Sequence, residues 1–350
     1  MSKVFRSSVC EPHARGREFG GVHARQIQTT VENYRALFDR VATRPFDLKA
    51  LGAEALCSIA DFAAPLHEEI LGIAEGAGIE PEYIGAINAR TEILAYLGAQ
   101  LRGECSTLVQ ANPFGAPVTA QTWDWYAEFA DTWLTWEIPH ADGRLTTTVT
   151  EYGIVGKPGV NNRGLATHFN ILHHQHDGQR IGVPVHVLAR WLLDSCSDIN
   201  QAIQLCHRAP VSASSVLTLV AAVDGASAAV SVELHPGGPA LVFPDDNGLL
   251  VHTNHFLAEA VRPFDTEPAA YPDTLVRYDL LRRRLTGRTG LKAMDLLCAL
   301  NSHLGSTGAL CCHPAADLPE AGQYATLATI LLDVPGCTLR ALPGGPCRHL

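Results

Sequence analysis

The amino-acid sequence predicts an α+β fold in which layered sheets are covered by helices. Between residues 26 and 94, apolar side chains recur at three- and four-residue steps, which is the helical period. After Gly103 the pattern changes to short alternating segments, rich in Val, Thr, Trp and Tyr and separated by turn residues. Helical patterns return within residues 184–207 and 273–304. Long sets of strands flanked by pairs of helices favour sheets that pack together beneath helical layers.

Most of the first hundred residues are expected to be helical. Residues 11–25 contain three glycines and are interpreted as an initial strand or turn that leads into a helix. The helical period begins at Gln26 and is carried by Val31, Tyr34, Leu37, Phe38 and Val41. A second helix is expected from about Asp61 to Glu75. Pro81 opens a third, because proline is common at the first helical position.

The remaining chain is expected to alternate between strands and helix pairs. Residues 105–110 and 117–126 predict a hairpin, joined by the turn-rich segment ANPFGA. Further strands are expected at residues 133–139, 145–157, 164–172, 215–224, 228–236, 248–256, 325–334 and 337–342. Helices are expected at residues 184–196, 198–207 and within 273–304. Without an internal repeat or a flexible linker, residues 1–350 are expected to form one domain.

The composition argues against several classes of function and location. The net charge of −10 disfavours nucleic-acid binding, because phosphate contacts need clustered Lys and Arg. The basic run Arg282-Arg283-Arg284 is interpreted as the polar end of a helix. No window approaches ~18 consecutive apolar residues and the N-terminus lacks a signal-peptide pattern, so no membrane partner is expected. The ten cysteines have no repeated spacing, which favours reduced thiols and a cytoplasmic location.

Cys105 is the main candidate nucleophile, although a buried, inert thiol is the more common state of a cysteine. It stands in Arg102-Gly103-Glu104-Cys105-Ser106-Thr107, where helical sequence gives way to strands. A cysteine at a strand start can attack the preceding carbonyl group in an N→S acyl shift, and hydrolysis then frees its α-amino group. That amine has a reference pKa of about 7.7–8.0, so it can act as the base for its own thiol.

Several segments of the chain resemble one enzyme family. They are NARTEILAYL, RGECST, AQTWDWY, EYGIVGKPGVNNRGLATHFNILH, GVPVHVLARWLLDS, VHTNHF and ATLATILLD, and together they extend over roughly residues 15–335. Their order and spacing are similar to those of the isopenicillin-N acyltransferase family of N-terminal-nucleophile hydrolases. The resemblance implies a four-layer αββα sandwich and self-cleavage between Glu104 and Cys105. It further implies an α chain of 1–104, a β chain of 105–350, and cleavage or transfer of an acyl group at an amide.

The resemblance also implies roles for three residues. Cys105 matches the family nucleophile. Asp124 matches an acidic position whose carboxylate can hold the freed amine, with a surface carboxylate at a turn as the alternative. Asn254 matches the oxyanion donor, a role for which a side-chain amide is suited, with a turn residue at a strand end as the alternative.

Two positions depart from the family pattern. Glu104 stands where the penicillin-type enzymes carry Gly, so a larger charged residue must fit the turn before the cleaved bond. Cys312 falls where the family carries an Arg that helps to organise the site. A cation is therefore missing at this position, unless His313 or a remote arginine replaces it.

The candidate residues of the substrate pocket are Trp123, His168, Asn170, Ser214, Cys312 and His313. A metal-binding reading of the histidine-rich segment HFNILHHQH is disfavoured, because it lacks the His-x-x-x-His spacing with a catalytic Glu. No metal and no cofactor are expected. Arg90 and Glu92 are interpreted either as a surface ion pair of a helix or as structural residues beside the nucleophile.

The sequence therefore predicts a self-processing amidohydrolase or acyltransferase that acts on a small N-acyl or aminoacyl amide through a thioester. The expected partners are a small-molecule amide or acyl-thioester substrate and the two chains of one precursor, and a homo-oligomer is left open. Three alternatives remain: transfer of an acyl group from a thioester to an amine, an unprocessed relative that binds a ligand, and a metal-dependent hydrolase.

Overall fold

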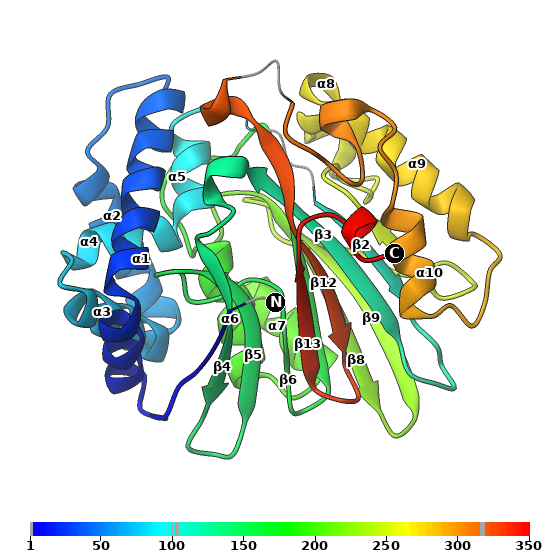
Figure 1. Cartoon of the computed structure of the whole chain (residues 1–350), viewed down its shortest axis with the longest axis horizontal. Helices are drawn as coiled ribbons and strands as arrows, with labels where there is room; N and C mark the ends of the chain where they lie inside the picture. The colour runs from blue at the N-terminus through cyan, green and yellow to red at the C-terminus, as the bar shows by residue number, and fades with distance from the viewer. Residues whose placement is uncertain (1–2, 100, 102–104, 316–318) are drawn as a thin grey trace.

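The computed structural model describes residues 3–99, 101, 105–315 and 319–350, and its described strands form two sheets (Figure 1). The larger sheet has the order β1(Val4–Arg6), β4(Trp133–Pro139), β5(Leu145–Glu151), β6(Gly159–Asn161), β7(Leu165–Ile171), β8(Ser215–Val223), β9(Ala226–Leu234), β10(Ala240–Val242). The smaller sheet has the order β11(Leu249–His252), β2(Ser106–Gln110), β3(Val118–Tyr126), β12(Tyr324–Asp333), β13(Thr338–Pro343).

The two sheets pack face to face, and polar side chains join them. Nearly all pairings are antiparallel, the exception being the parallel pair of β1 and β4. The predicted hairpin is confirmed, since β2 and β3 pair antiparallel with Ser106 opposite Thr122. From β7, Asn170 accepts a hydrogen bond from Thr107 Oγ1 of β2 over 2.6 Å, and His168 Nε2 lies 3.0 Å from Thr119 Oγ1 of β3.

Helices cover the outer face of the larger sheet. They are α1(Pro12–Val41), α2(Leu48–Phe62), α3(Ala64–Ala77), α4(Pro81–Asn88), α5(Arg90–Tyr96), α6(Val185–Ser195) and α7(Ile199–Arg208). Phe19 of α1 stacks on Trp136 of β4 at 4.1 Å between ring centroids. Residues of α6 and α7 share an apolar cluster with β7, β8 and β9, whose members include Leu188, Leu205 and Leu217.

A second helical layer covers the smaller sheet. It consists of α9(Asp273–Leu285) and α10(Ala293–Leu300), and the short α8(Glu267–Ala270) precedes it. Leu281 and Leu297 pack against Leu108 of β2 and Leu249 of β11 in one buried cluster. Helices thus cover the outer face of each sheet, as Figure 1 shows. The expected α+β fold with four layers, αββα, is confirmed.

The first helix begins earlier than the sequence predicts. Residues 12–25, which we interpreted as a strand or turn, belong to α1. The glycines here serve a close helix contact, because a Cβ added to Gly16 would lie 2.0 Å from the carbonyl oxygen of Glu69, and one on Gly72 would lie 2.1 Å from that of His13. Glycine in this segment therefore reflects the approach of α1 to α3 rather than a break in the helix.

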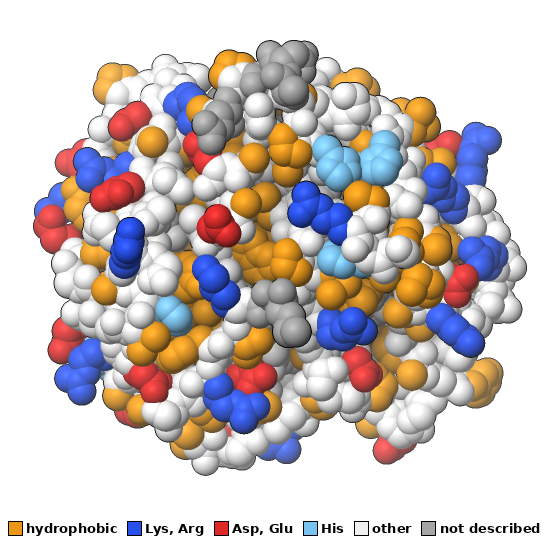
Figure 2. Space-filling model, viewed as in Figure 1, with side chains coloured by type: hydrophobic (Ala, Val, Ile, Leu, Met, Phe, Trp, Pro, Cys, Tyr) orange, Lys and Arg blue, Asp and Glu red, His pale blue; other side chains and the backbone are white. Residues whose placement is uncertain are grey.

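The surface mixes charges and shows no large patch of one sign on the face drawn in Figure 2. Among the described residues, no helix is both long enough and apolar enough to cross a membrane.

Candidate active site

Cys105 lies directly before β2, with its side chain buried. Its carbonyl oxygen accepts hydrogen bonds from Asn170 Nδ2 over 3.1 Å and from Arg277 Nη1 over 3.2 Å. Asn170 Nδ2 also donates to the carbonyl oxygens of His252 and Thr253. This side-chain amide therefore links the residue before β2 to the end of β11 and the residue that follows it. The backbone on the C-terminal side of the candidate nucleophile is thus held from two directions.

Arg277 of α9 is a buried cation beside Cys105 that sequence reasoning missed. Its Nη1 donates to Ser106 Oγ over 3.1 Å, and its Nη2 donates to Asn254 Oδ1 over 3.1 Å. The sequence did contain a signal for this buried arginine. The buried face of α9 is formed by residues at three- and four-residue steps, namely Thr274, Arg277, Leu281 and Leu285. An arginine on the apolar face of a helix indicates a charged partner, since an unpaired buried charge is costly.

Asn254 is buried, and its orientation is determined by contacts at both ends of its amide. Its Oδ1 accepts from Arg277, and its Nδ2 donates to the carbonyl oxygen of Ile171 over 2.9 Å. Its backbone N–H donates to Thr274 Oγ1 over 2.9 Å. An amide nitrogen carries two hydrogens, so Asn254 is able to donate a second one to a substrate oxygen.

Asp124 of β3 is also buried and lies opposite Thr326 of β12. Its backbone N–H is directed toward the thiol of Cys105. Burial and the negative charge of Asp124 raise the pKa of Cys105 to about 12, while the Asp124 N–H, Lys157 and Arg277 act in the opposite direction. In the intact chain the thiol is therefore neutral near pH 7, and it needs a base before it can react.

A buried ionic network lies next to this group. Lys157 Nζ is 2.6 Å from Glu151 Oε2 and 3.9 Å from the ring centroid of Trp123. Tyr34 donates to Glu151 Oε1 over 2.6 Å. Burial and the charge of Arg90 lower the pKa of Lys157 to about 7, although Glu151 and Cys105 act to raise it. Lys157 can therefore change its charge near neutral pH while adding positive potential at Cys105.

Arg90 belongs to this network and makes no surface pair with Glu92. Its Nε lies 3.5 Å from Glu151 Oε2, and its guanidinium lies 4.4 Å from the ring centroid of Trp125. Glu92 instead accepts from the backbone N–H of Val185 over 2.9 Å. The structure thus favours the second interpretation of these residues, a structural role in the core next to the site.

A small cavity of about 20 Å³ lies near this group of residues. Its lining is mainly apolar and includes Leu94 of α5, Trp125 of β3 and Ile171 of β7. His173 and Asp177 supply its polar part. Cys105, Asp124 and Asn254 are not among its lining residues, although Ile171, which lines it, accepts a hydrogen bond from Asn254 through its carbonyl oxygen.

The structure brings some of the predicted pocket residues to Cys105 and places others elsewhere. Asn170 contacts the carbonyl group of Cys105, and Trp123 contacts Lys157. Cys312 donates its backbone N–H to Thr326 Oγ1 over 2.9 Å, on the strand opposite Asp124.

Three predicted residues lie outside this group. Ser214 donates to Asp177 Oδ1 over 2.7 Å, near the polar part of the cavity. His168 lies between the sheets, where burial lowers its pKa to about 3, so it is a neutral core residue. The exposed His313 lies beside His303. Glu104, on the other side of the predicted cleavage site, lies outside the described residues.

The histidine-rich segment does not form a metal site among the described residues. His173 pairs with Glu267, with 2.5 Å between Nδ1 and Oε2. His174 stacks against His235, at 5.1 Å between ring centroids. The group of described residues whose geometry could hold an ion lies elsewhere, at His303, Cys311, His313 and Cys347.

Comparison with known proteins shows which family this region resembles. Residues 112–283 match the family model of acyl-coenzyme A:6-aminopenicillanic acid acyl-transferase. This range contains Asp124, Asn254 and Arg277 and begins after Cys105. The chain is 32% identical over 226 residues to the acyl-coenzyme A:6-aminopenicillanic-acid-acyltransferase 40 kDa form of Emericella nidulans, covering 65% of this chain and 61% of that protein.

Two solved structures are distantly similar in backbone. The N-acylethanolamine-hydrolyzing acid amidase ortholog of Caenorhabditis elegans matches with 12% identity and a TM-score of 0.49, over 68% of this chain and 100% of the other. Penicillin V acylase from Agrobacterium tumefaciens matches with 15% identity and a TM-score of 0.40, over 65% of this chain and 80% of the other. On the sequence matches, residues 112–283 of this chain are similar to the acyl-coenzyme A:6-aminopenicillanic acid acyl-transferase family, and the region that matches the Emericella nidulans relative spans 61% of the length of that protein.

Proposed function

We propose that this chain is a self-processing enzyme that cleaves or transfers the acyl group of a small N-acyl compound, with Cys105 as nucleophile. The observation that carries the proposal is that three buried groups converge on Cys105 and a fourth is linked to it through one of them. Arg277 and Asn170 hold its carbonyl oxygen, the Asp124 N–H faces its thiol, and Asn254 is linked to it through Arg277.

The processing step would use the intact chain. The Cys105 thiol gives up its proton and its sulfur attacks the carbonyl carbon of Glu104, while the amide C–N bond breaks and the nitrogen takes a proton. A water molecule then breaks the thioester, which leaves a carboxyl group on Glu104 and a free amine and thiol on Cys105. The fixed carbonyl group of Cys105 supports this step, because rotation of the attacking residue costs conformational entropy.

In the processed enzyme, the free amine of Cys105 would take the proton of its own thiol. The carboxylate of Asp124 would hold that amine, and Asn254 would donate to the oxyanion that forms when sulfur attacks the substrate carbonyl. A donor held in place in a water-poor site is worth roughly 3–4 kcal/mol at the transition state. The contacts of Asn254 with Arg277 and Ile171 support this role, since they keep the amide from rotating.

The mainly apolar lining of the small cavity at Trp125 and Ile171 supports an apolar acyl group, rather than a charged one, as the part of the substrate that is recognised. Water as the acceptor would make the enzyme an amidohydrolase, and a bound amine would make it an acyltransferase. The Emericella nidulans relative is named for acyl transfer from coenzyme A to 6-aminopenicillanic acid. Transfer from an acyl thioester to an amine is therefore the second candidate reaction.

Intact-mass measurement of the purified chain tests processing. We expect two fragments that meet between Glu104 and Cys105, and a single chain in Cys105→Ala. Cys57→Ala, which changes an exposed cysteine, is the matched control and should be processed normally. One uncut chain in both the native protein and the control would contradict self-processing and favour a ligand-binding relative.

A second assay separates hydrolysis from transfer. The processed protein is incubated with a panel of N-acyl amides, and separately with an acyl thioester and an amine. Release of free acid from the amides indicates a hydrolase, whereas formation of a new amide from the thioester indicates a transferase. Processed protein that does neither, across short and long acyl chains, would contradict the proposed substrate class.

A further inference from the structure

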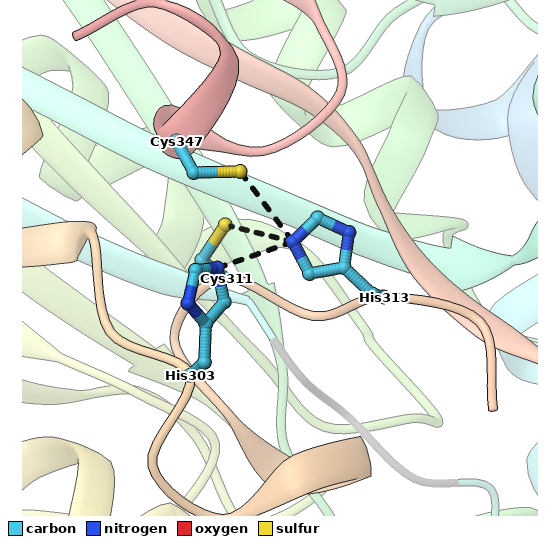
Figure 3. A group of neighbouring side chains, drawn as sticks. All are labelled: His303, Cys311, His313 and Cys347. Carbon is cyan, nitrogen blue, oxygen red and sulfur yellow. Dashed lines mark hydrogen bonds between the residues drawn. The ribbon is translucent and has the colours of Figure 1, made fainter.

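We propose that His303, Cys311, His313 and Cys347 form a structural zinc site. The four residues come from three segments: the loop after α10, the segment before β12, and the C-terminal η5(Pro346–Arg348). Figure 3 shows their side chains pointing toward one another, with dashed lines joining one ring nitrogen of His313 to both sulfur atoms and to the His303 ring. One ligand atom from each residue lies within 4.8 Å of all the others.

The three distances from His313 Nε2 to the other ligand atoms fit a tetrahedral ion. Zinc binds histidine nitrogen at about 2.0–2.1 Å and cysteine sulfur at about 2.3 Å, so tetrahedral ligands would be roughly 3.3 Å apart for two nitrogens and roughly 3.6 Å for nitrogen and sulfur. The two Nε2 atoms of His303 and His313 are 3.2 Å apart. His313 Nε2 lies 3.7 Å from Cys311 Sγ and 3.4 Å from Cys347 Sγ. All three distances are within about 0.2 Å of the tetrahedral values.

Hydrogen bonding alone explains this cluster poorly. A single atom, His313 Nε2, faces one nitrogen and two sulfur atoms, yet an imidazole nitrogen can donate one hydrogen or accept one bond. A cation at the centre would satisfy all of these lone pairs at once. Two sulfur and two imidazole ligands in a tetrahedron are the donor set preferred by zinc among common divalent ions.

The backbone around the cluster is already arranged for binding. The N–H of Cys311 donates to the carbonyl oxygen of Ser302 over 3.0 Å, which brings the first two segments together. The sulfur of Cys311 also packs directly onto the backbone at Gly345, where an added Cβ would lie 2.4 Å away. A residue with a side chain at this position would displace one ligand, so the glycine keeps room for the sulfur.

Four protein ligands leave no open position on the ion, so the site is structural rather than catalytic. The ion would tie the C-terminal turn to the segment that contains Cys312. Cys312 in turn exchanges two hydrogen bonds with Thr326, which lies opposite Asp124 in the smaller sheet. Zinc would therefore stabilise the layer behind the candidate active site without contacting substrate. Because it depends on these four residues alone, the proposal does not require Cys105 to be catalytic.

Metal analysis of the purified full-length chain tests the site. We expect about one zinc per chain after dialysis, and X-ray absorption with two sulfur and two nitrogen ligands at about 2.3 and 2.0 Å. Replacing the zinc with cobalt(II) should produce the visible d–d absorption of a tetrahedral site and a thiolate charge-transfer band. These measurements use the native protein, so they do not depend on whether a variant folds.

Variants then assign the ligands. Cys347→Ser and His303→Ala each remove one ligand from the partly or fully exposed side of the site, and each should weaken zinc binding by more than about 10-fold. Gly345→Ala retains all four ligands but crowds Cys311, and it should also weaken binding. Cys337→Ser and His349→Ala are the controls, because both residues lie in the same C-terminal region outside the cluster.

Three results would overturn the proposal. The first is native protein that neither retains zinc nor shows a tetrahedral cobalt spectrum. The second is equal zinc binding by the ligand variants and the two controls. The third is a disulfide between Cys311 and Cys347 in freshly purified protein that persists when the protein is prepared with zinc and a thiol reductant.

Discussion

Arg277 donates from Nη2 to Asn254 Oδ1 over 3.1 Å, and from Nη1 to the carbonyl oxygen of Cys105 over 3.2 Å. One guanidinium group thereby sets the position of the candidate nucleophile and the orientation of the candidate oxyanion donor. The family resemblance predicts an arginine at the position of Cys312, and Arg277 is a buried cation of α9 that contacts both Cys105 and Asn254. Arg277 therefore supplies a cation at the candidate site.

Arg277→Lys should slow self-cleavage and substrate turnover by about 10- to 100-fold, the effect of losing one or two charged hydrogen bonds. An ammonium group cannot reproduce the two-sided contact of the guanidinium with Cys105 and Asn254. Rates of fragment formation and acyl release measure this change. Arg283→Lys, an exposed substitution on the same helix, is the control. Equal rates for the two variants would show that Arg277 only fills space.

Asn254→Asp should lower the rate of acyl transfer to Cys105 by about 100- to 1,000-fold, because it replaces the amide donor with an acceptor. The carboxylate would still accept from Arg277, although it could no longer donate to the carbonyl oxygen of Ile171. The expected signature is a fall in kcat with a smaller change in KM. Asn200→Asp, on the surface of α7, serves as the control. A change confined to KM would argue that Asn254 positions substrate rather than stabilising an oxyanion.

Lys157→Met should destabilise the protein by about 3–5 kcal/mol, because it leaves Glu151 buried without its closest partner. The double variant Lys157→Met with Glu151→Gln should recover most of this loss, since it removes both charges and still lets Tyr34 donate to the residue at position 151. Urea unfolding of the native chain, both single variants and the double variant measures the coupling. Additive losses would contradict a coupled buried pair.

Glu92 should make the protein less stable as the pH rises through neutrality. Burial raises the pKa of Glu92 to about 7 from its usual 4.5, so the folded state binds a proton that the unfolded state has lost between these values. Its stabilising contribution is complete below pH 4.5 and is lost as the pH rises through about 7, at about 1.4 kcal/mol for each pH unit.

Glu92→Gln should therefore be more stable than the native chain at pH 8 and similar to it at pH 4.5. The amide remains neutral and can still accept from the backbone N–H of Val185. Urea unfolding at both pH values measures the difference, with the exposed Glu259→Gln as control. A difference between native and variant that does not change with pH would contradict a titrating, buried Glu92.

Local patterns in the sequence were sufficient for most of the elements and for the candidate chemistry. Alternation of side chains located β4 at residues 133–139, and the turn-rich segment between β2 and β3 located their hairpin. Short strands such as β1, β6 and β10 were missed, because three residues carry too little periodicity to be recognised. The early start of α1 was missed because a glycine in the sequence is compatible both with a turn and with a close contact between two helices.

The sequence by itself predicted most of the elements and their order, and it offered Cys105 and, through the family resemblance, Asp124 and Asn254 as candidates for an acyl reaction. Only the tertiary structure decided which strands share a sheet, and with it that Arg277 meets Cys105 across 172 positions of the chain. It likewise decided that Cys347 meets Cys311 and His313. The physical reason is that the spacing of apolar residues predicts the type of each segment and which of its faces is buried. Contacts between distant segments depend instead on how whole sheets and helices pack against one another.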